Sequence, residues 1–374
     1  MVKNNRIIEE FLELVRVDSV SGKERRIADL LKAKLFQLGL EVTEDKAGTA
    51  VGSDTGNIIG KMQGSGNGPV LLLCSHMDTV EPGIGVKPVT DDGVIRSSGD
   101  TVLGADDKAG IAAILEVLRM IREYGIDHGG IEVVFTIWEE GGLFGAKNLD
   151  FALVNAKIGF VLDSDGPPGT IINRAPSQDK IGVTIKGKAA HAGINPEDGI
   201  NAIEVASHAI AHMKLGRIDR ETTSNIGIIS GGKAVNIVPD SVVLEGEARS
   251  LDAAKRKAQT EHMCRAVREA ADKFKAHADI ITETLYMDFN LGDKSPPVQI
   301  AYRSAVNLGL VPRLEKTGGG SDANIFNSMG IATAVLGIGM QKVHTTEEYI
   351  TVSNLVENAR YLFEIVKVAQ DMRF

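Results

Sequence analysis

A histidine and an aspartate stand where an apolar segment of the chain ends. In the stretch LLLCSHMDTV, residues 71–80, His76 and Asp78 are two positions apart. Side chains two positions apart on a strand point to the same face of a sheet. A metal-binding histidine commonly donates its second ring N–H to a carboxylate, which fixes the orientation of the ring. The pair therefore suits a metal ligand and its supporting carboxylate, although on its own a hydrogen-bonded histidine followed by a capping aspartate is the simpler interpretation.

Carboxylates recur at the ends of three further segments. LGADDKAG places Asp106 and Asp107 before a helix, VFTIWEEGG ends a strand with Glu139 and Glu140, and GFVLDSDG ends another strand with Asp163. In an open α/β sheet, ligands bind at the carboxyl ends of the strands, so we expect these side chains to share one edge. Taken singly, each fits a helix cap or an exposed turn. Taken together, they would repel one another strongly unless cations were bound among them.

A second histidine, His344, follows a further apolar segment in GMQKVHTTEEY. Together with His76 it adds imidazole nitrogens to the carboxylate oxygens. Two histidines and several carboxylates form a ligand set for two zinc ions, and cobalt or manganese would also accept these donors. The residue types therefore predict a dinuclear metal site.

The elements that must position these residues alternate between strand and helix. Continuous apolar strands are expected at 70–77, 131–140 and 158–165, and a long helix at 107–125 is expected to end at Gly125. Strands without a polar face are typical of a parallel sheet covered by helices. The sequence therefore predicts an α/β fold with a mostly parallel sheet.

The pattern changes from about Gln178, where strands with alternating polarity begin. The expected order is strand, helix, strand, strand, helix, strand, over residues 180–191, 199–213, 224–232, 241–250, 252–277 and 279–288. This order is that of the ferredoxin-like, split βαβ module. We therefore expect an α/β domain formed by residues 1–177 and 289–374, interrupted by an inserted α+β domain at 178–288.

Charge and composition argue against several classes of partner. The net charge of −9 and the pI near 5.5 do not suit nucleic acid or an anionic membrane surface, which both attract clustered Lys and Arg. No apolar run approaches the ~18 residues of a membrane span, and the N-terminus lacks an apolar signal core. Cys74 and Cys264 are far apart in the sequence, and two free thiols suit a reducing compartment. A cytoplasmic location is therefore expected.

Seven segments together resemble a known family, in their order and in their spacing. They are SHMDTV, LGADDKAGIAAI, EEGGLFGAKNL, VLDSDG, AAHAG, GGGSDANIF and HTTEEYI. They are similar to the co-catalytic zinc exopeptidases that include peptidase T and carboxypeptidase G. GADDKAG together with Asp163 looks most like the peptidase T branch, and the resemblance covers nearly the whole chain.

The resemblance implies a role for each candidate ligand. His76 and Asp163 would bind one zinc ion, Glu140 and His344 would bind the other, and Asp106 would bridge the two. Zinc would therefore be the cofactor.

Further roles also come from the resemblance. Asp78 would orient His76, and Glu139 would be the general base. His191 in AAHAG would contact the substrate. The inserted module would serve as lid and dimerisation domain, which implies a homodimer in which His191 acts in the partner's site. The family also has a non-proline cis peptide after the bridging aspartate, here expected between Asp106 and Asp107.

These features predict an enzyme that releases the N-terminal residue of small peptides with a zinc-activated water and a glutamate base. Two interpretations compete with it. An amidohydrolase, deacylase or carboxypeptidase acting on N-acyl amino acids would use the same metals and base. A non-catalytic two-domain binding protein would keep the metal site for ligand capture, but it would have no need for a base at Glu139.

Overall fold

The computed structural model describes residues 2–372 and divides the chain into two compact units. The first unit comprises the chain up to Asn173, then Asn290–Lys316, and then the chain from Ser321 onward. The second unit comprises Arg174–Phe289 and Thr317–Gly320. Its boundary lies a few residues before the expected start at 178, and the short segment 317–320 was not expected to belong to it.

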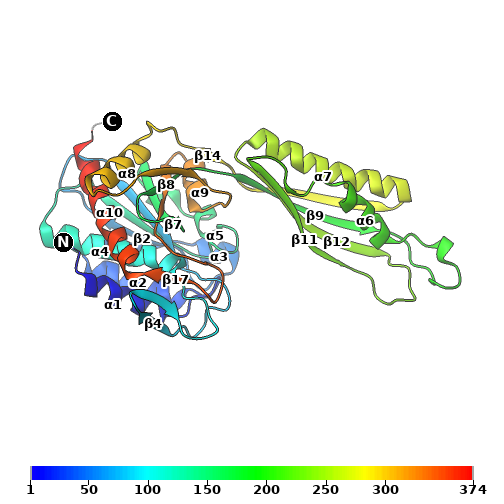
Figure 1. The fold of residues 1–374 in the computed structure, drawn as a ribbon, viewed down its shortest axis with the longest axis horizontal. Coiled ribbons are helices and arrows are strands. Elements are labelled where there is room, and N and C mark those ends of the chain that lie inside the picture. Colours follow the sequence, from blue (N-terminus) through cyan, green and yellow to red (C-terminus); the bar gives the residue numbers. More distant parts are fainter. Residues whose placement is uncertain (1, 373–374) are drawn as a thin grey trace. The chain divides into compact units, whose positions relative to one another are not determined.

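The first unit is built around a nine-stranded sheet (Figure 1). The strand order is β1-β2-β6-β3-β7-β16-β8-β14, and β15 pairs with β8. The bounds are β1 Glu41–Glu44, β2 Ile58–Met62, β3 Leu71–His76, β6 Ile131–Thr136, β7 Ile158–Ser164, β8 Thr170–Ala175, β14 Phe289–Asn290, β15 Arg313–Lys316 and β16 Ala332–Gly337. The central strands β6, β3, β7 and β16 run parallel, whereas β1, β2 and β8 pair antiparallel nearer the edges. The predicted α/β class with a mainly parallel sheet is confirmed.

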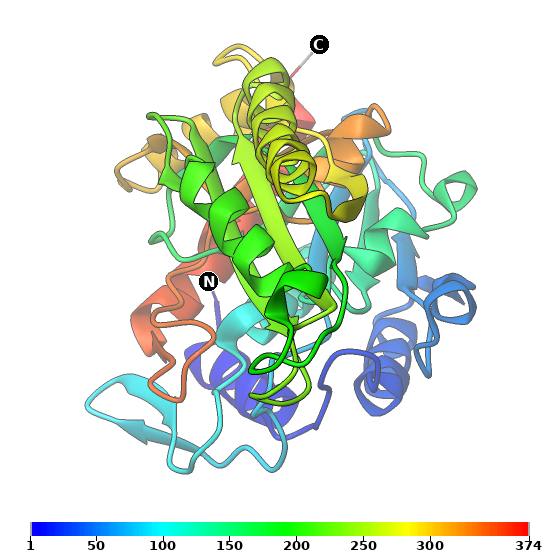
Figure 2. The same ribbon diagram turned by 90° about the vertical axis from the view of Figure 1, so that its right-hand side faces the viewer.

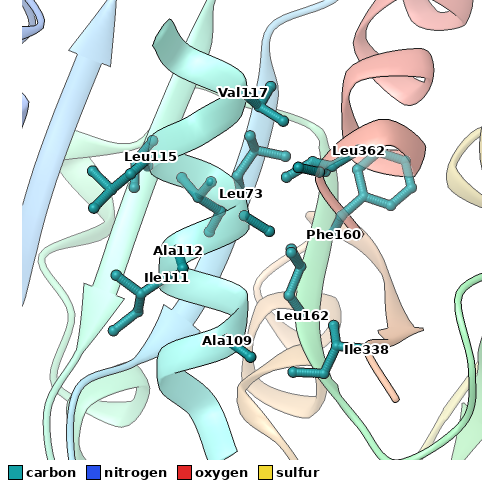
Figure 3. Close-up of a cluster of buried hydrophobic side chains, with 14 of the residues drawn as sticks. Leu73, Ala109, Ile111, Ala112, Leu115, Val117, Phe160, Leu162, Ile338 and Leu362 are labelled. Carbon is teal, nitrogen blue, oxygen red and sulfur yellow. The ribbon is translucent and has the colours of Figure 1, made fainter. Parts of the chain in front are cut away.

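Helices cover this sheet and share one apolar core with it. Their bounds are α1 Asn4–Val15, α2 Arg25–Gln37, α3 Ala47–Val51, α4 Ala105–Tyr124, α5 Phe144–Lys147, α8 Pro296–Asn307, α9 Asp322–Ser328 and α10 Val352–Asp371. Figure 3 shows Val117 of α4 and Leu73 of β3 on the side of α4 that faces Phe160 of β7 and Leu362 of α10. Each such side chain contributes about 1.5–3 kcal/mol when fully buried. This packing holds α4 against β3, β7 and α10.

Helix α4 begins and ends at glycines with positive φ. Gly104 has φ 78° and Gly125 has φ 58°, so the predicted end of the helix at Gly125 is confirmed. The backbone at Asp106 and Asp107 is not helical, and regular helix follows them. Within the helix, a Cβ at Gly110 would come within 2.3 Å of Ser75 Oγ and 2.5 Å of Asp107 Oδ1. A glycine at this position therefore permits the close approach of α4 to β3.

A small three-stranded sheet, which the sequence did not predict, lies in the same unit. It consists of β4 Pro88–Asp91, β5 Val94–Ser97 and β17 Tyr349–Thr351, in the order β17-β5-β4. The antiparallel register pairs Tyr349 with Arg96 and Thr351 with Val94. The chain before Asp106 and the chain after His344 are therefore held together by a ladder.

The second unit is an antiparallel sheet with two helices. Its bounds are β9 Ser177–Lys186, α6 Ala202–His212, β10 Gly216–Arg217, β11 Thr222–Gly231, β12 Ser241–Ser250, α7 Ala253–Phe274 and β13 His277–Tyr286. The strand order is β10-β11-β12-β9-β13. Ile181, Val183 and Ile185 of β9 alternate into a core with α6 and α7, which lie side by side (Figure 1 and Figure 2). The predicted β-α-β-β-α-β module is confirmed.

A search of the helices within residues 2–372 finds none that is long and apolar enough to cross a membrane.

Candidate active site

The four central parallel strands deliver the candidate residues to one edge of the sheet. The register pairs His76 at the end of β3 with Thr136 at the end of β6, and Cys74 with Val161 of β7. Asp163 lies near the end of β7 itself, whereas the segments that follow β6 and β16 carry Glu139 and Glu140, and His344, respectively. The expected convergence at the carboxyl ends of the strands therefore follows from the parallel register.

His76 is held between two aspartates. Its ring is buried, with Nε2 at 3.1 Å from Asp106 Oδ1. Its Nδ1 lies 2.9 Å from the main-chain oxygen of Asp78 and 3.4 Å from Asp78 Oδ1. Burial disfavours the imidazolium form, but the hydrogen bonds to Asp106 and Asp78 outweigh it and raise the pKa of His76 well above its ordinary value. Asp78 therefore contacts the ring with both its backbone and its side chain.

The carboxylate of Asp78 also fixes the turn that carries the two glutamates. It is fully buried and accepts the N–H of Glu139 at 2.9 Å, the N–H of Glu140 at 3.2 Å and the hydroxyl of Ser21 at 2.6 Å. Burial opposes ionisation, but contacts with His76, Ser21 and the Glu139 N–H lower the pKa of Asp78. One buried carboxylate thus positions both the histidine and the glutamate pair.

A second buried carboxylate, Glu24, holds the start of the same turn. Glu24 Oε1 accepts the N–H of Trp138 at 2.9 Å, and Ser53 Oγ donates to Oε2 at 2.9 Å. Trp138 has φ 47°, a left-handed conformation that a bulky side chain rarely adopts. Burial and the nearby charge of Asp78 raise the pKa of Glu24 to about 7. The backbone just before Glu139 is therefore held in an unusual conformation by specific hydrogen bonds.

Asp106 lies between the two histidines. Its Oδ1 faces His76 Nε2, and its Oδ2 lies 3.2 Å from His344 Nε2. Burial raises the pKa of Asp106, but His344 and His76 outweigh burial and hold that pKa well below its usual range. The peptide bond between Asp106 and Asp107 is cis, so the expected non-proline cis peptide is confirmed.

His344 contacts a second carboxylate in addition to Asp106. Its Nε2 lies 2.9 Å from Glu140 Oε1, and its side chain is half exposed. The hydrogen bonds to Asp106 and Glu140 raise the pKa of His344 to about 10. In the metal-free protein, these two carboxylates therefore stabilise an imidazolium.

Glu139 and Asp163 complete the cluster, and neither has an ion-pair partner within residues 2–372. Burial, followed by the charge of Asp163, raises the pKa of Glu139 well above its ordinary value. Burial, followed by the charge of Asp106, does the same for Asp163. The cluster therefore holds more carboxylates than its two imidazoles neutralise.

The donor atoms fit a metal centre. One ligand atom each from His76, Asp106 and Glu140 lie within 4.8 Å of one another, and His344 contacts the last two. Imidazole nitrogen and carboxylate oxygen are donors that zinc accepts. Divalent cations would also relieve the repulsion among the buried carboxylates. The residues present are therefore suited to bind metal.

His191 belongs to the second unit, whereas the other candidate residues belong to the first. It is exposed, it forms an isolated bridge with Ile237, and its Nδ1 accepts the N–H of Gly193 at 3.2 Å. The implied contact with a substrate remains a prediction.

Three residues that hold the cluster were not identified from the sequence: Ser21, Glu24 and Glu348. Each acts through hydrogen bonds between segments that are far apart in the chain. For Glu348 the sequence contained one weak signal, the segment HTTEEYI, which belongs to the family resemblance. This segment contains two adjacent glutamates, Glu347 and Glu348, and its pattern does not indicate which of them is buried.

The resemblance implies that His344 is a zinc ligand, and zinc binding in that role is expected to release protons at neutral pH. The pKa of His344 is raised to about 10, so its ring is protonated in the metal-free protein, and it must lose that proton to become a ligand. Affinity should therefore rise as the pH increases toward that value. Titration calorimetry in buffers of different ionisation enthalpy measures the proton count, and His344→Ala should release fewer protons. Equal release by the variant and the parent protein would contradict this assignment.

Comparison with known proteins gives a consistent result. The model of Peptidase family M20/M25/M40 matches residues 72–368. A tripeptidase structure from Staphylococcus aureus subsp. aureus Mu50 is 44% identical, with a TM-score of 0.96 over 100% of both chains. An aminopeptidase PepT structure from Bacillus cereus ATCC 10987 is 44% identical, with a TM-score of 0.92 over 98% of this chain and 99% of the other.

A more distant relative in sequence is carboxypeptidase G2 from Pseudomonas sp. (strain RS-16). It is 33% identical over 335 residues, which cover 85% of this chain and 77% of the relative. The similar proteins therefore include both groups that the sequence resemblance named, peptidase T and carboxypeptidase G.

Proposed function

We propose that this chain, which belongs to Peptidase family M20/M25/M40, is a zinc-dependent aminopeptidase that releases the N-terminal residue of small peptides. Family membership makes the chain a peptidase, and the family is metal-dependent. The observation that carries the proposal is the position of Asp106, whose two carboxylate oxygens each face a different histidine. That geometry supports two adjacent metal positions that share one carboxylate.

Two zinc ions would be held by five side chains. We assign one ion to His76 and Asp163, the other to Glu140 and His344, and the bridge to Asp106; cobalt or manganese would suit the same donors. When bound, a metal pair of this kind polarises a scissile carbonyl and lowers the pKa of a water.

Glu139 is assigned as the general base. Its side chain is buried beside the cluster, and Asp78 accepts its N–H, so its position is fixed. A carboxylate in this position can take a proton from the attacking water and return it to the leaving amine. Glu140 is its neighbour in the chain and directs its carboxylate to His344, so the two glutamates divide the roles of base and ligand.

Blocking the α-amino group of the substrate is expected to abolish turnover. The family resemblance implies that the ligand at the position of Asp163 is Asp in aminopeptidases and Glu in carboxypeptidases. Trialanine should therefore be cleaved with release of the N-terminal alanine, and N-acetyl-trialanine should not be cleaved. Mass spectrometry of the products, with trialanine labelled at one end, identifies the residue that is released.

The alternative function would give the opposite result. Identity of 33% to carboxypeptidase G2 favours a carboxypeptidase or deacylase as the second candidate. Rapid cleavage of N-acyl substrates, with release of C-terminal residues or free acyl groups, would establish that candidate in place of the aminopeptidase.

The second unit is assigned as the lid and dimerisation domain. Within the described residues, β10 pairs only with Thr223 and Ser224 of β11, so the later part of β11 forms an open edge. Ile228 and Ile229 on that part are 53% and 56% exposed. Pairing two such edges would protect both. This supports a two-fold homodimer formed by the lids.

We also assign the protein to the cytoplasm. Cys74 and Cys264 are both buried, free thiols, which suits a reducing compartment.

A further inference from the structure

Glu348 stands at the base of the loop that carries His344. Gln341 and Tyr349 exchange backbone hydrogen bonds of 2.9 and 3.1 Å, which close a hairpin loop of residues 342–348. His344 lies inside this loop, and Glu348 is its last residue. The side chain of Glu348 is almost completely buried, with the residue only 2% exposed.

The carboxylate of Glu348 accepts hydrogen bonds from the segment that leads to Asp106. Its Oε2 accepts the N–H groups of Leu103 and Gly104, both at 2.8 Å. Its Oε1 accepts the N–H of Asp106 itself at 3.0 Å. Buried N–H groups need an acceptor, and a carboxylate offers two oxygens that accept without donating. Glu348 therefore satisfies three donors of the Asp106 segment at once.

The flanking strands hold both partners of this contact in register. Glu348 directly precedes β17, and β17 pairs with β5, whose chain continues toward Leu103. Ile350 and Ile95 are opposite each other and completely buried. The contact is therefore part of a rigid connection between the two loops that supply His344 and Asp106.

We propose that Glu348 is a positioning residue of the metal centre, which fixes the bridging Asp106 relative to His344. Both of its carboxylate oxygens accept backbone N–H groups, so its effect on the metal centre passes through Asp106 and the hairpin. By holding the backbone of Asp106, it sets the direction in which the two carboxylate oxygens point. By anchoring the hairpin, it sets the place of His344. The inference rests on the metal centre proposed above.

The test is zinc affinity in Glu348→Gln, measured with the full-length protein. The amide has the same shape, but one of its two positions becomes an NH₂ donor that faces a backbone N–H. Loss of a group that orients metal ligands typically weakens metal binding ~10–100-fold. We expect that loss in a titration of metal-free protein with zinc against a chromophoric chelator. The absorption spectrum of the cobalt-loaded variant should also change, because it reports ligand geometry.

Glu347→Gln is the matched control. Glu347 is the preceding residue, its side chain is 71% exposed, and it pairs with Lys342 at the surface. The control should keep the zinc affinity and cobalt spectrum of the parent protein. Thermal unfolding of the metal-free proteins shows whether each variant is folded.

The outcomes separate this inference from the proposed function. A folded Glu348→Gln with unchanged zinc affinity and cobalt spectrum would overturn the positioning role, even if its melting temperature fell. If Glu348→Gln does not fold, Glu348→Asp takes its place, because it keeps the charge but moves the carboxylate away from the three N–H groups. Unchanged zinc affinity and cobalt spectrum in that variant would likewise overturn the positioning role. Failure of the parent protein to bind zinc would overturn the metal centre, and this inference with it.

Discussion

Glu139→Gln is expected to keep its zinc and to lose ~10²- to 10⁴-fold in kcat. Glutamine has the shape of glutamate but cannot take a proton from water at neutral pH. The backbone N–H of residue 139, which donates to Asp78 at 2.9 Å, is unchanged by the substitution, so the turn should keep its position. Steady-state kinetics on a tripeptide, with metal content measured by atomic emission, test both parts of this expectation.

Glu140→Gln provides the contrasting variant. The carboxylate of Glu140 lies 2.9 Å from His344 Nε2, and we assign it as a ligand. Its loss should therefore lower zinc occupancy as well as activity. If Glu139→Gln hydrolysed peptides at the rate of the parent protein, the assignment of the base would be wrong.

The convergence of the candidate metal ligands could be predicted because it depends on a simple feature of the fold. Apolar strands without a polar face indicated a parallel sheet, and each ended in an ionisable side chain. Parallel strands bring their carboxyl ends to one edge, so His76 and Glu140 were expected near one another, and Asp106 at the start of α4 lies with them. The end of α4 at Gly125 could also be predicted from the sequence, because glycine readily adopts the positive φ that commonly ends a helix.

The second set of contacts could not be predicted, because it depends on tertiary pairing. The spacing of two residues associated Asp78 with His76, although β3 ends at His76 and Asp78 follows it. The carboxylate of Asp78 also accepts the N–H groups of Glu139 and Glu140. That contact exists because β3 and β6 are neighbours, and no local pattern encodes which strands are neighbours. The role of Glu348 was hidden in the same way, since it needs the pairing of β17 with β5.

The short strands were missed for a different reason. The strands β4, β5 and β17 have only three or four residues each, which is too short for a clear alternation of apolar and polar side chains. The assignment of Thr317–Gly320 to the second unit could not be predicted either, because this segment is also too short. This glycine-rich segment carries no apolar pattern that would assign it to either unit.

His191→Ala is expected to reduce kcat by ~10²- to 10³-fold, which is the typical cost of removing one hydrogen-bond donor to a developing oxyanion. Sequence position alone would suggest an exposed loop histidine without a role. The exposed ring and its place in the second unit are compatible with a donor supplied to another subunit. We therefore expect His191 to act in the active site of the partner in a lid-mediated dimer. His212→Ala, another exposed histidine of the same unit, is the control and should retain activity.

Mixing two inactive variants tests the action in trans. In a mixed dimer of His191→Ala and Glu139→Gln subunits, the catalytic domain of the first keeps Glu139 and receives an intact His191 from the second. Random reassociation of equal amounts would restore about a quarter of the parent activity, because half of the two-fold dimers are mixed and each has one complete site. If His191 acted within its own subunit, every site in the mixture would lack one group, and no activity would return. A monomer that is fully active at nanomolar concentration would also exclude the arrangement, because a site completed by a partner cannot work alone.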